Sequence, residues 1–276
     1  QSRSSAASDV YKRQICYHKA VSENLIDLTI ILPTINECEN LEKLIPQIVG
    51  DIDNSLVKDY EIIVVDDGST DNTKQLIHNL NSKNENIKLF ERKTQPSLPM
   101  AIYDGINKSN YEYVMWLDAD GSMPATTIKD LISLQSENLD NVIIGSRFVK
   151  GGGYKGIQEI GKTSFFSALA NVRQSKDSVS GMIASTLFNK LLIFILKSPI
   201  KDLTSGFIIG KRQYFLEESF SKSSYGEYFV YLMTDLMKKN VNIQELGYIC
   251  ETRIHGESKT ASSLVQLFRR GVPYIK

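Results

Sequence analysis

The chain has 276 residues, of which 42% are apolar and 23% are charged. This length suits one large α/β domain, and the composition is typical of a globular protein with a full core. The formal net charge is zero, so we expect no nucleic-acid partner, because there is no bulk basic field to attract one. The three cysteines lie far apart without zinc-site spacing, which indicates a reducing, cytoplasmic compartment.

The sequence pattern predicts neither a membrane span nor a signal peptide. No run of residues reaches the roughly 18 apolar positions expected of a span. Residues 1–14 show no apolar region and no helical periodicity, and their string resembles a translated sequencing adapter. We therefore expect residues 1–24 to be an unstructured or artefactual tail and residues 25–276 to form the folded domain.

Five short runs rich in β-branched residues recur along the first half of the chain, spaced by about one βα unit. Helical patterns fill the gaps between them, and this alternation predicts an α/β fold with a mostly parallel sheet. The predicted strands are Leu28–Leu32, Glu61–Val65, Ile87–Phe90, Tyr113–Leu117 and Val142–Ile144.

Start signals place the helices between these strands. Asn36 is predicted to be the N-cap of the first helix, because Glu39 stands at the capping-box position three residues later. The other helices of the first half are predicted after Asp71, over Met100–Ile106, and from Pro124 to about Ser136.

The character of the sequence changes after Phe148. A glycine-rich loop leads into helical segments up to Ile200, and Asp202–Ile209 returns to strand. A helix over Glu227–Lys239 and a strand over Ile243–Tyr248 follow. We divide the domain into a nucleotide-binding half, 25–148, and an acceptor-binding half, 149–276, with no clear linker between them.

Acidic residues end two of the predicted strands. Asp66 and Asp67 follow the second strand, and Asp118 and Asp120 follow the fourth. The carboxyl ends of parallel strands meet at one edge of a sheet, where open α/β folds bind ligands. Carboxylates gathered there repel each other unless a cation lies among them. The pattern predicts a metal-dependent enzyme that uses a nucleotide diphosphate sugar, although each cluster alone also fits a simple turn.

Further candidate residues are predicted at the same edge. Asp66 is the candidate acceptor of hydrogen bonds from a nucleobase or ribose, and Glu37, after the first strand, is another. Arg147 follows the fifth strand, and Arg253 and Lys259 flank a short flexible loop. Three cations suit a site that holds a nucleotide diphosphate and an anionic acceptor.

Six motifs occur in order: Pro-Thr-x-Asn-Glu (33–37), Asp-Asp-Gly-Ser (66–69), Asp-Ala-Asp (118–120), Gly-Ser-Arg (145–147), Asp-Leu-Thr-Ser-Gly-Phe (202–207) and Gly-Glu-Ser-Lys (256–259). Together they resemble the family 2 glycosyltransferases of the dolichyl- or polyprenyl-phosphate mannosyltransferase type. The resemblance covers about residues 28–260. It implies a Rossmann-like GT-A fold, an inverting mechanism and a lipid phosphate as acceptor.

The resemblance also implies the site residues. Contacts to the nucleotide sugar carry over to Pro33, Ile35, Glu37, Val64, Asp66, Asp118, Ala119, Asp120, Arg147, Arg253 and Lys259. Mg²⁺ or Mn²⁺ would be bound by Asp120 and Ser122. The assigned catalytic residues are Asp120, Arg253 and Asp202, the last as a base or as a group that orients the acceptor. The usual Gly-Leu-Gly of the family appears here as Ser97-Leu98-Pro99.

The expected reaction is transfer of a hexose from a nucleotide diphosphate sugar, of the GDP-mannose or UDP-glucose type, to a polyprenyl or dolichyl phosphate. A phosphate acceptor is already ionised near pH 7, so the reaction requires no strong general base. The segment Met182–Leu196 is rich in apolar residues, with Lys190 inside it and Lys197 just after it. A core helix would show the same pattern. We expect peripheral attachment to the cytoplasmic face of a membrane through this segment, with a membrane-anchoring partner subunit as a further candidate.

Two other functions remain open at this stage. A family 2 transferase with a hydroxyl acceptor would build surface polysaccharide, and that chemistry requires a carboxylate base. A non-catalytic nucleotide-binding subunit could use the same fold. Turnover of a nucleotide sugar with a lipid extract separates these three functions.

Overall fold

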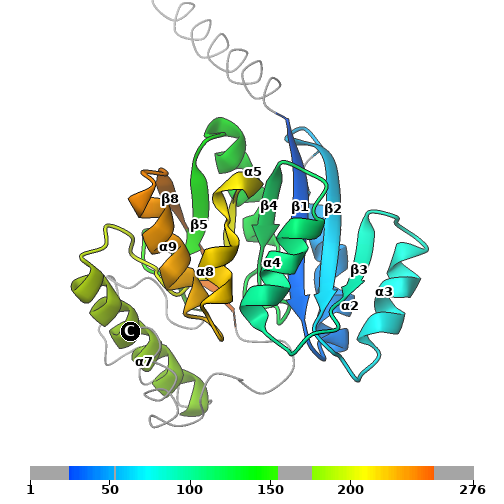
Figure 1. Ribbon diagram of the computed structural model, residues 1–276, viewed down its shortest axis with the longest axis horizontal. Coiled ribbons are helices and arrows are strands. Elements are labelled where there is room, and N and C mark those ends of the chain that lie inside the picture. Colours follow the sequence, from blue (N-terminus) through cyan, green and yellow to red (C-terminus); the bar gives the residue numbers. More distant parts are fainter. Residues whose placement is uncertain (1–24, 53, 155–175, 252–276) are drawn as a thin grey trace, which may run out of the picture.

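The computed structural model describes residues 25–52, 54–154 and 176–251, with side chains in the last range from residue 185 onward. The predicted tail and two predicted site residues, Arg253 and Lys259, lie outside these residues. Within the described ranges, a seven-stranded sheet is covered on both faces by helices (Figure 1).

The strands of this sheet are ordered β3-β2-β1-β4-β7-β5-β8. Neighbours run parallel except at β7, which is antiparallel to both β4 and β5. The predicted mostly parallel α/β sheet is thereby confirmed. The strands are β1 (Ile26–Thr34), β2 (Val57–Asp66), β3 (Ile87–Glu91), β4 (Tyr113–Trp116), β5 (Val142–Ser146), β7 (Ile208–Lys211) and β8 (Ile243–Gly247), and a separate short ladder pairs β6 (Gly153–Tyr154) with β9 (Ile249–Cys250).

The predicted helices occur in the predicted order, and α8 and a 3₁₀ turn are additional to them. The helices are α2 (Cys38–Asp51), α3 (Thr73–Asn81), α4 (Leu98–Lys108), α5 (Thr126–Glu137), α7 (Lys176–Leu196), α8 (Glu217–Ser221) and α9 (Tyr228–Lys238), and a 3₁₀ turn, η1, covers Arg212–Tyr214. None of the helices in the described ranges combines the length and the apolar character that a bilayer crossing requires.

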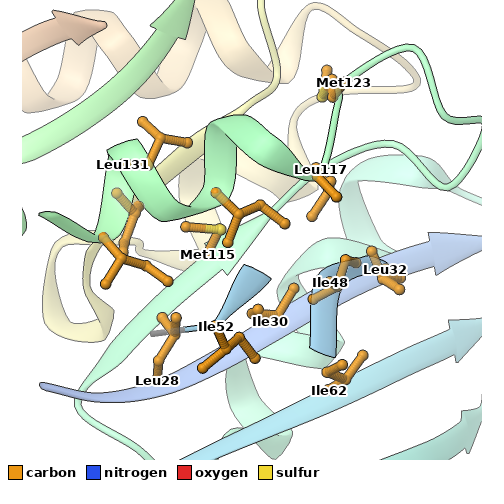
Figure 2. Packing of buried hydrophobic residues seen from close by; sticks show 14 of the residues in the cluster. Leu28, Ile30, Leu32, Ile48, Ile52, Ile62, Met115, Leu117, Met123 and Leu131 are labelled. Carbon is orange, nitrogen blue, oxygen red and sulfur yellow. The ribbon is translucent and has the colours of Figure 1, made fainter. Parts of the chain in front are cut away.

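The strand alternation of β1 divides the core into two layers. Leu28 and Ile30 are fully buried on the face covered by α2 and α5, whereas Ile31 packs on the opposite face against α4. Figure 2 shows part of the first layer, in which Leu28 and Ile30 lie near Met115 of β4. In Figure 1, α4 and α8 cover the side of the sheet that faces the viewer.

The strand register brings the ends of β1, β2 and β4 to one edge of the sheet. Thr34 at the end of β1 lies opposite Asp66 at the end of β2, and Ile31 lies opposite Trp116 at the end of β4. The arrows of β1 and β2 point to the same edge (Figure 1). The loops after these three parallel strands therefore leave the sheet at the same edge, where open α/β folds bind ligands.

Two local predictions were wrong. Asn36 is not the N-cap of the first helix, because α2 begins at Cys38 and its N-cap is Glu37. The backbone of Asn36 is left-handed, with φ of 54°, and its side chain bonds to the next loop instead. The predicted strand from Asp202 begins only at Ile208, because 202–207 forms a loop that turns at Gly206, whose φ is 77°.

Candidate active site

Asp66 closes β2 and is almost fully buried, with 1% of its surface exposed. Its carboxylate oxygens accept hydrogen bonds from the Ser69 backbone amide at 3.2 and 3.3 Å, and one lies 3.6 Å from the Lys74 ammonium. Val64 is also buried in β2. Asp66 is therefore held in place at the base of the loop after β2.

Asp67, its neighbour, has a structural role. Its carboxylate accepts a hydrogen bond from the Arg92 guanidinium and another from the Ser97 amide at 2.5 Å. Arg92 also binds Asp104 through Nε at 2.7 Å, and only 4% of its side chain is exposed. Ser97 in turn caps α4, because its hydroxyl accepts a hydrogen bond from Met100. The departure from Gly-Leu-Gly therefore supplies a helix cap that is tied to Asp67.

The loop after β4 holds the second acidic pair. Asp120 and Ala119 are buried, whereas Asp118 is half-buried. The Asp120 carboxylate accepts a hydrogen bond from the Ser122 amide at 2.9 Å, across a turn in which Gly121 has φ of 76°. The Ser122 carbonyl accepts a hydrogen bond from Glu251. The proposed metal ligands Asp120 and Ser122 are thus neighbours in one tight turn.

Arg147 follows β5 and forms a two-pronged ion pair with Asp202. Nε and Nη2 of Arg147 donate to the two carboxylate oxygens of Asp202 at 2.9 and 2.8 Å, and the Arg147 amide adds a bond of 2.9 Å. Asp202 is fully buried. Burial alone would lower the pKa of Arg147, but the Asp202 carboxylate outweighs it and raises that pKa further.

Rings and hydroxyls complete the surroundings of this arginine. The Phe148 and Tyr154 rings lie 5.4 and 5.6 Å from the guanidinium carbon, within cation–π range. The Thr204 hydroxyl accepts a further bond at 2.8 Å. The guanidinium is therefore held by contacts on several sides, and its orientation is set before any substrate binds.

The Asp202 loop is itself clamped from two elements. Asn189 of α7 accepts a bond from the Leu203 amide and donates one to the Lys201 carbonyl. Glu245 of β8 accepts bonds from the amides of Lys201 and Asp202 at 2.8 and 3.1 Å. The loop at 201–203 thus connects α7 and β8 to Arg147.

Cys250 is a site neighbour that the sequence analysis did not identify. Burial raises its pKa to about 11; Arg147 opposes this shift, and Asp120 and Asp118 add to it. The thiol therefore lies within electrostatic reach of both the acidic loop and the arginine. Nothing in its local sequence signals this, because two long-range contacts bring it there: the pairing of β9 with β6, and the bond from the Glu251 amide to the Ser122 carbonyl.

The residues predicted after β1 lie at the same edge. Pro33 is buried within the strand and Ile35 is half-buried beside it. One carboxylate oxygen of Glu37 accepts a bond from the Asn40 side chain at 2.6 Å. The structure thus brings Pro33, Ile35, Val64 and Asp66 to neighbouring positions on paired strands and their loops.

A divalent cation fits the chemistry of the acidic loop. Among the described residues, no three His, Cys, Asp or Glu side chains are grouped closely enough to hold a metal by themselves. Mg²⁺ commonly binds through one or two carboxylates together with substrate phosphates, rather than in an all-protein cage. The turn at 120–122 carries one such carboxylate, on Asp120, and one hydroxyl oxygen, on Ser122.

Comparison with known proteins identifies the family. The model for "Glycosyl transferase family 2" matches residues 29–218, which is more than half of the chain. The chain belongs to glycosyl transferase family 2. Over 169 residues it is 36% identical to a dolichol-phosphate mannosyltransferase of Pyrococcus furiosus, covering 57% of this chain and 45% of that protein.

A second relative is a poly(ribitol-phosphate) beta-N-acetylglucosaminyltransferase, TarP, of Staphylococcus aureus, 31% identical over 165 residues, or 55% of this chain and 49% of that protein. The chain therefore spans about half the length of the curated relatives it matches.

A solved structure supports the fold. Glucosyl-3-phosphoglycerate synthase of Mycobacterium tuberculosis, in complex with Mn²⁺, uridine diphosphate and phosphoglyceric acid, superposes with a TM-score of 0.61 at 16% identity. The match covers 95% of this chain and 80% of that one. The predicted GT-A fold is confirmed.

Proposed function

We propose that this protein is an inverting glycosyltransferase that moves a hexose from a nucleotide diphosphate sugar to a polyprenyl or dolichyl phosphate. The observation that carries the proposal is the meeting of two acidic loops, after β2 and after β4, at one edge of the sheet. The 36% identity to a dolichol-phosphate mannosyltransferase supports the lipid phosphate as acceptor.

The donor half of the proposal uses the residues at this edge. Asp66, which is buried and held by Ser69, accepts hydrogen bonds from the base or ribose. Asp118, which is more exposed than Asp120, lies beside the ribose and the diphosphate. Arg253 and Lys259, outside the described residues, are proposed to hold the leaving diphosphate.

Asp120 and Ser122 are proposed to hold Mg²⁺ or Mn²⁺. When bound, the cation neutralises charge on the leaving diphosphate. The superposed synthase was solved with Mn²⁺ and uridine diphosphate, which supports this choice of ion. The Ser122 amide fixes one carboxylate oxygen of Asp120, so the other oxygen is oriented by the same turn.

On the acceptor side, Asp202 is proposed to orient rather than to remove a proton. Both of its carboxylate oxygens are engaged by Arg147, and no part of the residue is exposed. An ionised phosphate acceptor requires a positioned cation more than a base. Arg147 is proposed as that cation, because Asp202 and the rings of Phe148 and Tyr154 fix the plane of its guanidinium.

Attachment to a membrane surface is proposed through α7. Leu187, Leu191 and Phe194, one helical stripe, expose 62%, 46% and 81% of their surfaces. Lys190 and Lys197 are exposed beside this stripe. An apolar stripe flanked by lysines suits insertion into the headgroup region of an anionic membrane. Figure 1 shows α7 at the margin of the molecule, beyond the edge of the sheet.

The test is transfer by the purified protein from a panel of donors that includes GDP-mannose and UDP-glucose. We expect a lipid-linked hexose when polyprenyl phosphate is supplied with Mg²⁺ or Mn²⁺, and about a hundredfold less, or lower still, with Asp120→Asn. Transfer only to a soluble polyol phosphate would favour the second candidate, a hydroxyl acceptor, which the similarity to a poly(ribitol-phosphate) transferase supports. Nucleotide binding without turnover would indicate a non-catalytic subunit.

A further inference from the structure

Hydrogen bonds centred on Asn36 join the loop after β1 to the loop after β2. Its side-chain oxygen accepts bonds from the Thr70 amide at 2.7 Å, the Thr70 hydroxyl at 3.3 Å and the Asp71 amide at 3.3 Å. Its backbone amide donates to the Ser69 hydroxyl at 2.9 Å. We call this arrangement the loop clasp, formed by Asn36, Ser69, Thr70 and Asp71.

The residue type suits this position for two separate reasons. The φ of Asn36 is 54°, a left-handed conformation that Asn and Asp adopt far more readily than other residues with a side chain. Its short amide also places an acceptor where two backbone amides of the next loop converge. Gly would satisfy the backbone requirement but not the second one.

The clasp leads directly to the proposed donor site. The Ser69 amide donates to both carboxylate oxygens of Asp66, and the Ser69 hydroxyl accepts from Asn36. Ile35 and Glu37 are the sequence neighbours of Asn36. The same few bonds therefore connect proposed donor contacts on two different strands.

Hydrogen bonds to the Asp71 carboxylate add to the loop clasp. One carboxylate oxygen of Asp71 accepts a bond from the Cys38 amide at 3.1 Å, and the other accepts from Thr73 at 3.0 Å. The first turn of α2 and the first turn of α3 are thus tied by one side chain. The two loops cannot shift independently while the loop clasp and the Asp71 bonds are both formed.

We propose that Asn36 is a positioning residue for nucleotide binding, which holds the loops after β1 and β2 in register around the nucleoside. This inference rests on the proposed function, because it assigns the clasped loops to the donor. Asn36 acts through Asp66, Ile35 and Glu37. Asn36, Thr70 and Asp71 are exposed, so the clasp contributes little to global stability and its effect is local.

The experiment compares three substitutions that separate the backbone from the side chain. Asn36→Gly keeps the left-handed backbone and removes the acceptor, Asn36→Ala removes both, and Asn36→Asp keeps both. Asn72→Ala is the matched control, because Asn72 lies in the same loop and forms no side-chain cap bond. Calorimetry measures binding of GDP and UDP with Mn²⁺, and thermal unfolding is recorded in parallel.

We expect Asn36→Gly and Asn36→Ala to weaken nucleotide binding about tenfold, as the loss of one or two hydrogen bonds would do. Asn36→Asp should stay within about threefold of the original chain, since it keeps the acceptor, and Asn72→Ala should bind unchanged. In the transfer assay, the donor KM should rise for Asn36→Gly while kcat stays nearly constant. The unfolding temperature should not fall in step with affinity.

Unchanged nucleotide affinity in Asn36→Gly would overturn the positioning role and leave the proposed function standing. Equal losses in Asn36→Asp and Asn36→Gly, or a loss that follows the unfolding temperature, would also overturn it. If the original chain binds neither nucleotide, the proposed function fails first, and the inference fails with it.

Discussion

Arg147 grips both carboxylate oxygens of Asp202, at 2.9 and 2.8 Å, although 55 residues separate them in the sequence. The Asp202 side chain is fully buried, and only 11% of the Arg147 side chain is exposed. A paired buried charge is tolerated, whereas the same charge without its partner is strongly destabilising. This asymmetry gives the first prediction.

Asp202→Ala should lower the free energy of unfolding by about 3–5 kcal/mol, because it leaves the Arg147 charge buried without a carboxylate. The double variant Arg147→Met with Asp202→Leu should recover most of that loss and yet remain inactive. Urea unfolding and the transfer assay measure the two effects. A double variant that is both stable and active would show that the pair has no part in the reaction.

Asp120→Asn should reduce transfer by about two orders of magnitude or more, because one lost charge leaves the diphosphate uncompensated. Asp130→Asn, on the exposed face of α5, is the control and should keep normal turnover. Rates are compared in Mg²⁺ and in Mn²⁺. Near-normal rates for Asp120→Asn in both ions would contradict the assignment of Asp120 to the metal.

Leu191→Glu should weaken sedimentation of the protein with anionic liposomes, because it places a negative charge in the exposed stripe of α7. Leu216→Glu is a matched control, since Leu216 is exposed to 45% and Leu191 to 46%, but Leu216 precedes α8. Nucleotide binding should survive in both variants. Equal liposome binding by the two variants would contradict the assignment of α7 to the membrane.

Glu61 should make the fold sensitive to acid. Its buried carboxylate accepts bonds from Thr29, Lys88 and Asn110, at 2.6 to 2.8 Å. Burial alone would raise the pKa of Glu61, but these bonds outweigh it and lower that pKa. A lowered pKa stabilises the fold above the unfolded value of about 4.3, and the contribution is lost as the pH falls through the folded value.

At pH 7, Glu61→Gln should therefore lose about 1.5–3 kcal/mol of unfolding free energy, the usual range for bonds to a charged group. The gap between the two proteins should narrow as the pH is lowered below about 4. Urea unfolding at a series of pH values measures it. A gap that stays constant down to pH 3 would show that the Glu61 charge contributes no stability.

Much of this architecture is predictable from sequence because apolar runs and acidic strand ends are local signals. Predicted strands such as Leu28–Leu32 and Tyr113–Leu117 are largely apolar runs. The acidic pairs that begin at Asp66 and Asp118 come at or just after the carboxyl ends of two strands. Parallel pairing then brings them to one edge. The predicted strands and their mostly parallel pairing were confirmed for that reason.

Other features depend on contacts between distant residues. The short run at Ile208 carries no information on direction, so its antiparallel place between β4 and β5 could not be foreseen. Asn36 matched a capping pattern, but a left-handed φ excluded it from that role. The bonds between Arg147 and Asp202 are equally absent from any local pattern, because they form only when the loop before β7 reaches the end of β5.

The place of β5 in the sheet has a consequence for synthesis of the chain. Val142, Ile143 and Ile144 are fully buried, yet both neighbours of their strand, β7 and β8, come after α7 in the sequence. On the ribosome, this apolar strand emerges long before either neighbour exists. Both of its edges are then open to other nascent chains. An mRNA truncated before the codon for Ile208 would therefore yield an aggregation-prone fragment. During translation, chaperone binding should concentrate on Val142–Ser146.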